Sequence, residues 1–297
     1  SKDGILFTKN LEILLCFPSY HHFSTYTIPS SVTTIGDSAF YECRGLKSIT
    51  IPKRVTSIGA KAFSGTSLRS ITIPTSVASI GESAFCNCGG LQSITIPTGV
   101  TSIGEFVFRG CSLLQSVTIL TGVTSIPDGA FFFCCSLKSI TIPSSVTSIG
   151  ESAFFDCSSL ESIVIPSGVT SISDTAFLDC SSLQSIVVEP NNLNYQSKDG
   201  ILFTNNLEIL VCFPPQHRFS TYAIPSSVTS IYDSAFFECH GLQSITIPLS
   251  VTLIGNFAFD CCVNLHTVSI PHLFRNQIPQ IFSSKRNLPE FSFILPN

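Results

Sequence analysis

The side chains with the widest range of possible chemistry in this 297-residue chain are its 13 cysteines. Such a number is compatible with disulfides, a zinc site or a column of buried thiols. Eight of them lie three residues after a recurring Phe, namely Cys43, Cys88, Cys111, Cys134, Cys157, Cys180, Cys239 and Cys262. The other five, Cys16, Cys86, Cys135, Cys212 and Cys261, lack zinc-site spacing with a second ligand pair. We therefore predict that the eight form a buried, unpaired ladder that donates to loop carbonyls, and the redox compartment stays open.

Acidic residues form a second column, which comprises Asp37, Glu82, Glu105, Asp128, Glu151, Asp174 and Asp233. Stacked carboxylates could supply the six to eight oxygens that Ca²⁺ needs. A carboxylate at the start of a short helical turn also caps backbone N–H groups without any ion. We favour capping.

Histidine supplies no catalytic or metal-binding motif. None of the six His lies in an H-E-x-x-H spacing, and the chain has no Gly-rich phosphate loop and no G-x-S-x-G motif. His21 and His217 occupy equivalent positions in two loops, and we interpret both as solvated. We therefore expect a non-enzymatic protein that needs no metal and no cofactor.

A 23-residue period positions all of these residues. The pattern Ile-Pro-x-x-Val-x-x-Ile-Gly-x-x-Ala-Phe-x-x-Cys-x-x-Leu-x-x-Ile-x recurs along the chain. A repeat this short cannot bury its own apolar face and must stack on copies of itself. Ile94 and Ile96 are expected to point inward, Ser93 and Thr95 outward, and Pro97 to close the strand. Gly104 is expected to permit a tight corner.

Twelve turns with parallel strands about 4.8 Å apart follow from this period. Their strands are predicted to end at Ile28, Ile51, Ile73, Ile96, Ile119, Ile142, Ile165, Val188, Ile224, Ile247, Ile270 and Phe293. Each turn is also expected to contain a short helical turn at Asp/Glu-Ser-Ala-Phe. The last turn should keep its inward apolar sites, Leu288 among them.

Two departures from the period are informative. The third turn is one residue short at Ser64–Ser67 and has no ladder Cys. The insertion after Val188 contains two apolar segments, Ile201–Thr204 and Leu207–Cys212, around two Asn, which predicts a β-hairpin. The hairpin is duplicated, because Ser1–Pro52 matches Ser197–Pro248 at 41 of 52 positions. We interpret it as a surface protrusion with a binding role.

One elongated domain over residues 1–297 is expected. Its parts are a hairpin-containing first turn (1–27), regular repeats (28–188), a hairpin-containing insertion turn (189–223), further regular repeats (224–270) and a degenerate C-terminal repeat (271–297). The chain opens in the middle of a motif that recurs at Ser197, so we expect it to be a piece of a longer protein whose signal and anchor lie outside it.

Composition restricts the partners. Charged residues make up only 11% of the chain, against about 25% in an average domain. A net charge of −4 argues against non-specific nucleic-acid binding. No apolar run approaches the roughly 18 residues of a membrane span, so no membrane insertion is expected.

The candidate binding residues lie at positions where the residue type differs from repeat to repeat although the position in the turn is the same. Basic residues cluster early, at Lys47, Lys53, Arg54, Lys61 and Arg69. The variable column beside the strands continues through Gln92, Gln115 and Lys138, and the hairpin loops add His21, His217 and Arg218. A protein ligand is the expected partner of these residues.

The repeats resemble the BspA-type, or Treponema pallidum-type, leucine-rich repeats. The segments that carry the resemblance are Leu91–Pro97, Val100–Gly104 and Ala84–Cys88, and it extends closely over 28–188 and 224–293. It implies an α/β fold: a right-handed leucine-rich-repeat solenoid with a parallel concave sheet, a short helical or irregular convex side and inserted hairpins.

The resemblance also implies a function. It points to a cell-surface or secreted protein that binds a host-cell or extracellular-matrix protein. The alternative is an intracellular protein-interaction scaffold, which the column of apparently reduced cysteines keeps open.

Overall fold

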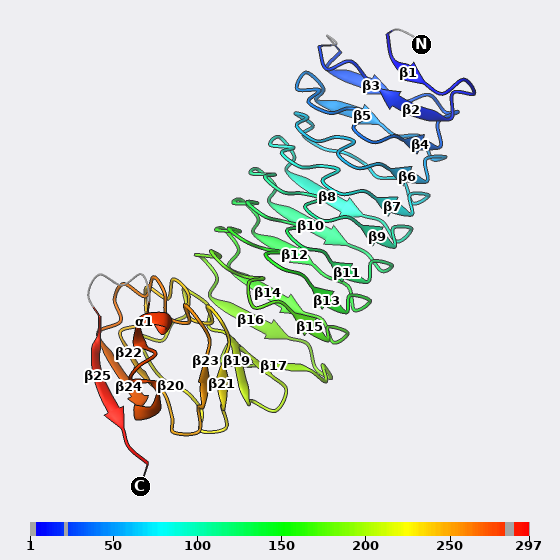
Figure 1. Cartoon of the computed structure of the whole chain (residues 1–297). Helices are drawn as coiled ribbons and strands as arrows, with labels where there is room; N and C mark the ends of the chain where they lie inside the picture. The colour runs from blue at the N-terminus through cyan, green and yellow to red at the C-terminus, as the bar shows by residue number, and fades with distance from the viewer. Residues whose placement is uncertain (1–3, 21–22, 283–287, 297) are drawn as a thin grey trace.

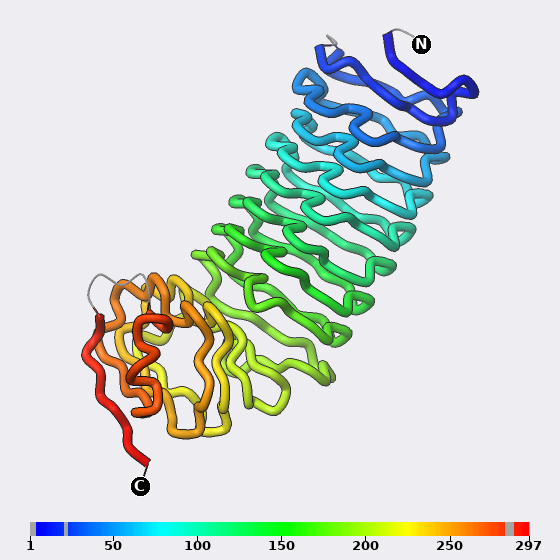
Figure 2. The backbone as a smooth tube through the Cα atoms, in the orientation of Figure 1, coloured from blue at the N-terminus to red at the C-terminus, as the bar shows by residue number. Residues whose placement is uncertain are grey.

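The computed structural model describes residues 4–20, 23–282 and 288–296, which form a solenoid of about 12 stacked turns. Its axis changes direction once (Figures 1 and 2). The turns from the N-terminus to about residue 188 are seen from the side, whereas those after about residue 213 are seen nearly end-on. The change of direction coincides with the hairpin-containing insertion.

One side of the solenoid carries the longer strands, which we call the long-strand side. They are β3 (Thr25–Thr27), β5 (Ser48–Thr50), β8 (Ser93–Ile96), β10 (Ser116–Ile119), β12 (Ser139–Thr141), β14 (Ser162–Ile165), β16 (Ser185–Val188), β20 (Thr221–Ala223), β22 (Ser244–Thr246), β24 (Thr267–Pro271) and β25 (Glu290–Ile294). Where strands of this side pair, they do so in parallel and one repeat apart, as Ser116 does with Ser93 and Ser139. Ile94 and Ile96 are buried and Ser93 is exposed, as the alternation predicts.

The opposite side is built from strands of two residues. They are β4 (Thr34–Ile35), β6 (Ser57–Ile58), β7 (Ser79–Ile80), β9 (Ser102–Ile103), β11 (Ser125–Ile126), β13 (Ser148–Ile149), β15 (Ser171–Ile172), β21 (Ser230–Ile231) and β23 (Leu253–Ile254). Within the described ranges the helices are the 3₁₀ turn η1 (His272–Phe274) and α1 (Ile278–Ile281). The predicted helical turn of each repeat is wrong, because those residues form hydrogen-bonded turns. Within the same ranges no helix is long and apolar enough to cross a bilayer.

Two side-chain ladders hold the turns together. Phe131, Phe154 and Phe177 stack with ring centroids 5.3 and 5.6 Å apart. The repeat Phe of the preceding turns stack in the same way; we call the turns before the insertion hairpin the first array and those after it the second array. The thiol of Cys157 donates to the carbonyl of Phe131 at 3.3 Å, one turn back. The other seven ladder cysteines repeat this contact. The structure therefore has the buried packing column that the sequence predicts.

Aspartates of the acidic column, namely Asp37, Asp128 and Asp233, accept hydrogen bonds from backbone N–H groups, although not within their own turn. The Asp37 carboxylate accepts a hydrogen bond from the Ala60 N–H at 2.8 Å, and Asp128 accepts one from Glu151 at 2.8 Å. Both bonds join a turn to the next turn. A fixed repeat lets a side chain satisfy an N–H group 23 residues away.

The insertion hairpin divides the hydrophobic core in two. Strand β17 (Tyr195–Lys198) pairs antiparallel with β18 (Ile201–Thr204), which pairs antiparallel with β19 (Ile209–Cys212). The side chains of Leu202 and Val211 pack into the core of the first array. Those of Ile201, Phe203 and Leu210 pack into the core of the second. The hairpin therefore separates the two cores and contributes side chains to both.

This arrangement corrects the prediction of a surface protrusion. Strand β19 pairs in parallel with β21, so it fills a place in the short-strand ladder. Phe213 stacks on Phe236 at 4.9 Å and begins the second Phe ladder. The apolar residues of the hairpin strands serve the core and are not available to a ligand.

The N-terminal copy of the hairpin has only one covered face. Strands β1 (Leu6–Phe7) and β2 (Ile13–Cys16) pair antiparallel, and β2 pairs in parallel with β4. Leu6 is 48% exposed, whereas its counterpart Leu202 is 0% exposed. The near-identical segments therefore differ in burial, because among the described residues a preceding turn packs only on the internal copy.

The C-terminal turn follows the period only in part. Phe282 stacks on Phe259 at 5.1 Å and β25 pairs with β24, as predicted. Leu288 is 53% exposed, so its predicted inward placement is wrong. Among the described residues no further turn packs on this side of it. Lys285, aligned with the ladder cysteines, lies outside the described residues.

Gly104 is required by stacking and not by backbone conformation. A Cβ at Gly104 would lie 2.3 Å from the backbone nitrogen of Glu82 in the preceding turn. We expect Gly104→Ala to destabilise the protein by about 1–3 kcal/mol through overpacking. At Gly241 the nearest atom would be 3.6 Å away, so Gly241→Ala should change stability by under about 0.5 kcal/mol. Equal urea midpoints for the two variants would contradict the close approach.

Candidate binding surface

The one-residue deletion in the third turn interrupts the long-strand side. Residues 70–73 form no strand, which corrects the prediction of a strand ending at Ile73. The backbone bond from Arg69 N to Lys47 O is 3.2 Å, and that from Gln92 N to Arg69 O is 3.3 Å. The equivalent bond from Gln115 to Gln92 is 2.8 Å. The shortened turn therefore loosens the stacking locally.

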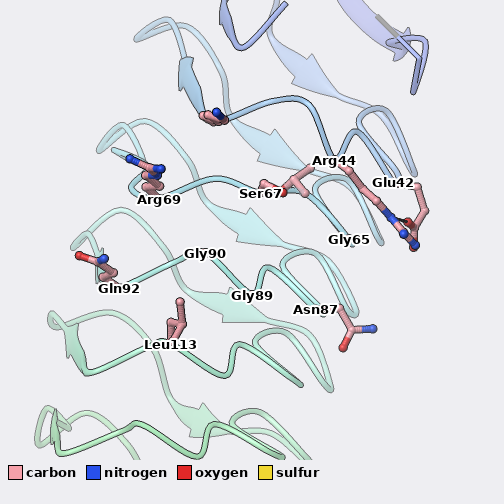
Figure 3. A pocket seen from close by; sticks show the side chains of 12 residues that line it. Glu42, Arg44, Gly65, Ser67, Arg69, Asn87, Gly89, Gly90, Gln92 and Leu113 are labelled. Atoms are coloured by element: carbon pink, nitrogen blue, oxygen red, sulfur yellow. Dashed lines mark hydrogen bonds and ion pairs between the residues drawn. The ribbon is translucent and has the colours of Figure 1, made fainter. Parts of the chain in front are cut away.

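A groove of about 710 Å³ lies at this interruption and crosses four turns (Figure 3). We call it the short-turn groove. Small residues line it, because the turn contributes Gly65 and the next turn Gly89 and Gly90. A Cβ at Gly90 would lie 3.0 Å from the carbonyl oxygen of Ser67, so the backbones approach closely there. The remaining lining residues are Glu42, Arg44, Lys47, Thr66, Ser67, Arg69, Asn87, Gln92 and Leu113.

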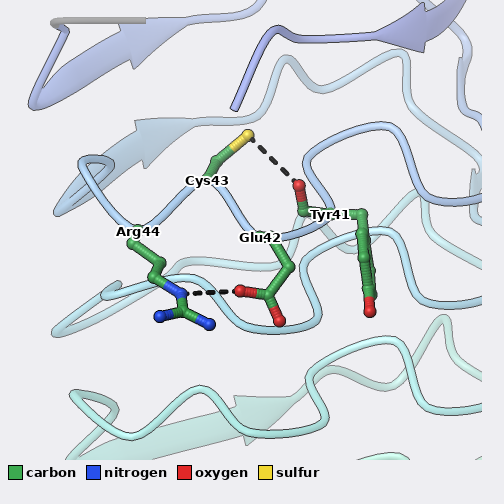
Figure 4. A network of polar contacts seen from close by, with 4 residues as sticks. All are labelled: Tyr41, Glu42, Cys43 and Arg44. Carbon is green, nitrogen blue, oxygen red and sulfur yellow. Dashed lines mark hydrogen bonds and ion pairs between the residues drawn. The ribbon is translucent and has the colours of Figure 1, made fainter. Parts of the chain in front are cut away.

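Three cations and one carboxylate line the short-turn groove. Arg44 donates from Nε to Oε2 of Glu42 at 2.6 Å (Figure 4), and this contact raises the pKa of the guanidinium. The Arg44 side chain remains 79% exposed. Lys47 and Arg69 are exposed, and in the described ranges no salt bridge to either is present. The groove therefore carries a net positive charge.

The remaining lining residues give the short-turn groove a mixed character. Asn87 and Gln92 provide exposed amides, which can donate and accept hydrogen bonds. Leu113 is 50% exposed at the far turn. Along the solenoid axis the cations lie on two turns, the amides on the next turn and Leu113 on the last, with Arg44 and Arg69 on opposite sides of the groove (Figure 3).

The structure brings only some of the predicted residues together. Lys47, Arg69 and Gln92 line the short-turn groove. Lys61 lines a separate hollow of about 630 Å³ with Arg109. The other predicted cations and amides are exposed outside both hollows, and these are Lys53, Arg54, Gln115 and Lys138.

The hairpin residues are placed differently from the prediction. His217 is 6% exposed, its Nε2 lies 2.8 Å from the Asp199 carbonyl oxygen, and its Nδ1 accepts from the Phe219 N–H at 3.2 Å. Burial lowers its pKa. The interpretation of His217 as a solvated residue is therefore wrong. Arg218 is exposed, with its guanidinium 5.1 Å from the Phe219 ring centroid, and His21 lies outside the described residues.

Several groove residues were not singled out from the sequence. Arg44, Glu42 and Leu113 have no special position in the repeat pattern. The missing residue near Ser64–Ser67 was the available signal, since a shortened turn must leave space beside its neighbours.

The duplicated segment supplies an internal comparison for the short-turn groove. Arg44 corresponds to His240 and Lys47 to Gln243, and these are two of only 11 differences in 52 positions. The second copy is followed by a turn of full length. The cations and the shortened turn therefore occur together at one place only in the sequence.

Charge is also unevenly distributed along the axis. Residues 43–81 contain six Lys or Arg and no Asp or Glu. Residues 139–197 contain six Asp or Glu and no Lys or Arg. The basic segment surrounds the short-turn groove, and its local field is opposite in sign to the chain's net charge of −4.

Comparison with known proteins identifies the class. The sequence profile of the BspA type leucine rich repeat region matches in six copies over residues 15–134, 102–213 and 211–296. The turns, the Phe and Cys ladders and the paired strands are those of a leucine-rich-repeat solenoid. The chain belongs to the BspA-type leucine-rich repeat family. A comparison with curated protein sequences gives no match.

Solved structures of bacterial proteins share the fold. A leucine-rich cell surface protein from Faecalibacterium prausnitzii is 32% identical, with 98% of this chain and 78% of that protein covered and a TM-score of 0.79. The pneumococcal vaccine antigen PcpA is 21% identical over 89% of this chain and 69% of its own, with a TM-score of 0.61. A leucine-rich repeat protein from Eubacterium ventriosum is 22% identical over 95% and 71%, with a TM-score of 0.51.

Proposed function

We propose that this chain is the protein-binding part of a cell-surface or secreted protein that attaches to host cells or to extracellular matrix. The observation that carries the proposal is the short-turn groove, a hollow whose cations Lys47 and Arg69 form no salt bridge within the described residues. The similarity to a leucine-rich cell surface protein supports the location. Loops and irregular segments on a rigid scaffold are where binding function concentrates.

The proposal includes no catalytic role. Burial raises the pKa of ladder thiols such as Cys111, Cys157 and Cys180 and keeps them protonated inside the solenoid. A catalytic thiol needs a lowered pKa and access to solvent. Burial raises the pKa of the Cys88 thiol but hydrogen bonds with Cys111 and Thr66 lower it by more, so its pKa is lowered. Cys88 and the other ladder cysteines are nevertheless buried and lack access to solvent.

Attachment can be measured directly. The purified chain should bind epithelial cells or immobilised matrix proteins more strongly than a leucine-rich repeat protein without a basic groove. Binding no stronger than that control, over a panel of matrix proteins and cell types, would reject adhesion. Binding only to cytosolic proteins from a host or bacterial lysate would favour the intracellular scaffold instead.

A further inference from the structure

The short-turn groove has the dimensions and chemistry of a site for an extended segment of polypeptide. It runs from the turn of Arg44 and Lys47 to the turn of Leu113, which is three steps along the solenoid. At about 4.8 Å a step the length is about 14 Å, which an extended peptide spans with about four residues. The site is therefore large enough for a short linear motif.

The charges determine which peptide it would accept. Arg44, Lys47 and Arg69 face the groove, and Glu42 already contacts Arg44. Arg presents a planar fork of donors that matches a carboxylate. The cations lie on two adjacent turns, so acidic residues should occupy one end of the peptide.

The other lining residues favour a peptide over a sulfated polysaccharide. A polysaccharide needs only a row of cations, whereas this groove also has the amides of Asn87 and Gln92 and the half-exposed Leu113. Amide side chains can hydrogen-bond to peptide N–H and C=O groups. Leu113 offers apolar contact to one hydrophobic side chain.

We infer that the short-turn groove binds an extended acidic peptide segment of a partner protein, with two adjacent carboxylates at Arg44, Lys47 and Arg69 and an apolar side chain about three residues further on at Leu113. The inference rests on the proposed function, since it names the partner chemistry of the same site. It makes the one-residue deletion the origin of specificity.

The duplicated segment and the neighbouring turns supply conservative variants. Arg44→His and Lys47→Gln introduce the residues of the second copy, His240 and Gln243. Arg69→Gln introduces the residue of the next turn, Gln92. The matched control is Lys9→Asn, which removes an exposed cation outside the groove and introduces the residue of the second copy, Asn205. Circular dichroism should be the same for all variants.

The probe is a labelled peptide containing Glu-Glu-Ser-Ser-Leu, measured by fluorescence anisotropy at low salt. The triple variant R44H/K47Q/R69Q is expected to bind it at least about tenfold more weakly than the wild type, from three exposed charge pairs. Lys9→Asn should bind as the wild type does. Added salt should weaken wild-type binding, and a Lys-Lys-Ser-Ser-Leu peptide should not bind.

Contrary outcomes are separable. Equal peptide affinity of wild type and triple variant, or no binding of the acidic peptide by wild type, overturns the inference. Binding of heparin that the triple variant loses, without peptide binding, assigns the cations to a sulfated glycan and also overturns it. If cells bind wild type and triple variant equally, adhesion stands and the groove assignment fails. If the acidic peptide binds through the cations but the chain binds no cell and no matrix protein, the adhesion proposal is rejected and the peptide-binding inference stands.

Discussion

Raising the pH from about 7 to about 10 is expected to destabilise this protein strongly, because ionisation of the unfolded cysteines opposes folding. Burial raises the pKa of six ladder thiols, and that of Cys43 reaches about 12 with a smaller contribution from Cys16. The six are Cys43, Cys111, Cys134, Cys157, Cys180 and Cys239. In the unfolded chain a thiol has a pKa of about 8.5.

The sign follows from proton linkage. A folded-state pKa above the unfolded value means that the folded protein holds its protons longer. The stabilisation is therefore fully present below about pH 8.5 and is lost as the pH rises toward the folded pKa. The contribution of a buried thiol such as Cys180 to the free energy of unfolding falls by about 2 kcal/mol by pH 10, since each pH unit above the unfolded pKa costs about 1.4 kcal/mol. Six such thiols act in the same direction.

Urea unfolding followed by circular dichroism at the two pH values measures this effect. Cys157→Thr is the matched variant, since Thr66 occupies the ladder position in the short turn. This variant should lose less unfolding free energy between the two pH values than the wild type, by about the contribution of one thiol. Tyrosine ionisation is the same in both proteins, so the difference reports cysteine alone. A midpoint that is the same at both pH values would show that the ladder thiols are not buried.

Phe154→Ala is expected to lower the free energy of unfolding by about 3–5 kcal/mol. Phe154 is 0% exposed and stacks between Phe131 and Phe177 at 5.3 and 5.6 Å. Removing the ring leaves a cavity that rigid neighbouring turns cannot close. Because each repeat contacts only its neighbours, the adjacent turns should also lose protection from hydrogen exchange.

The matched control for this substitution is Leu193→Ala. Leu193 is 81% exposed, so its truncation should change the free energy of unfolding by under about 0.5 kcal/mol. Urea midpoints and hydrogen exchange of both variants would make the comparison. If Phe154→Ala unfolded at the wild-type midpoint, the inward placement of the Phe ladder would be wrong.

Strict repetition explains why so much of the fold could be predicted. Each interior turn meets the same surroundings 23 residues away on either side, so one repeat determines the placement of all of them. Ile94 and Ile96 point inward, and Cys157 lies in a column, for this reason. The prediction failed for Leu288, which is exposed, because among the described residues no following turn covers it as one covers the equivalent Leu of the interior turns.

The candidate site was less predictable than the fold. Lys47, Arg69 and Gln92 were found because they occupy a variable column, but Arg44 and Leu113 were not. Binding by the other predicted residues stays a prediction, except for His217, which is buried. Its environment depends on Asp199, 18 residues away across the hairpin, and no pattern in the sequence expresses that contact.

The sequence by itself determined the solenoid, its two ladders and the alternation of buried and exposed residues, because these depend on a period that every turn repeats. Only the tertiary structure decided what the irregular segments do. It turned the hairpin into a partition between two cores, since Leu202 and Phe203 face opposite arrays. It also turned one missing residue into a groove, because the effect of a deletion depends on how the turns on both sides of it pack.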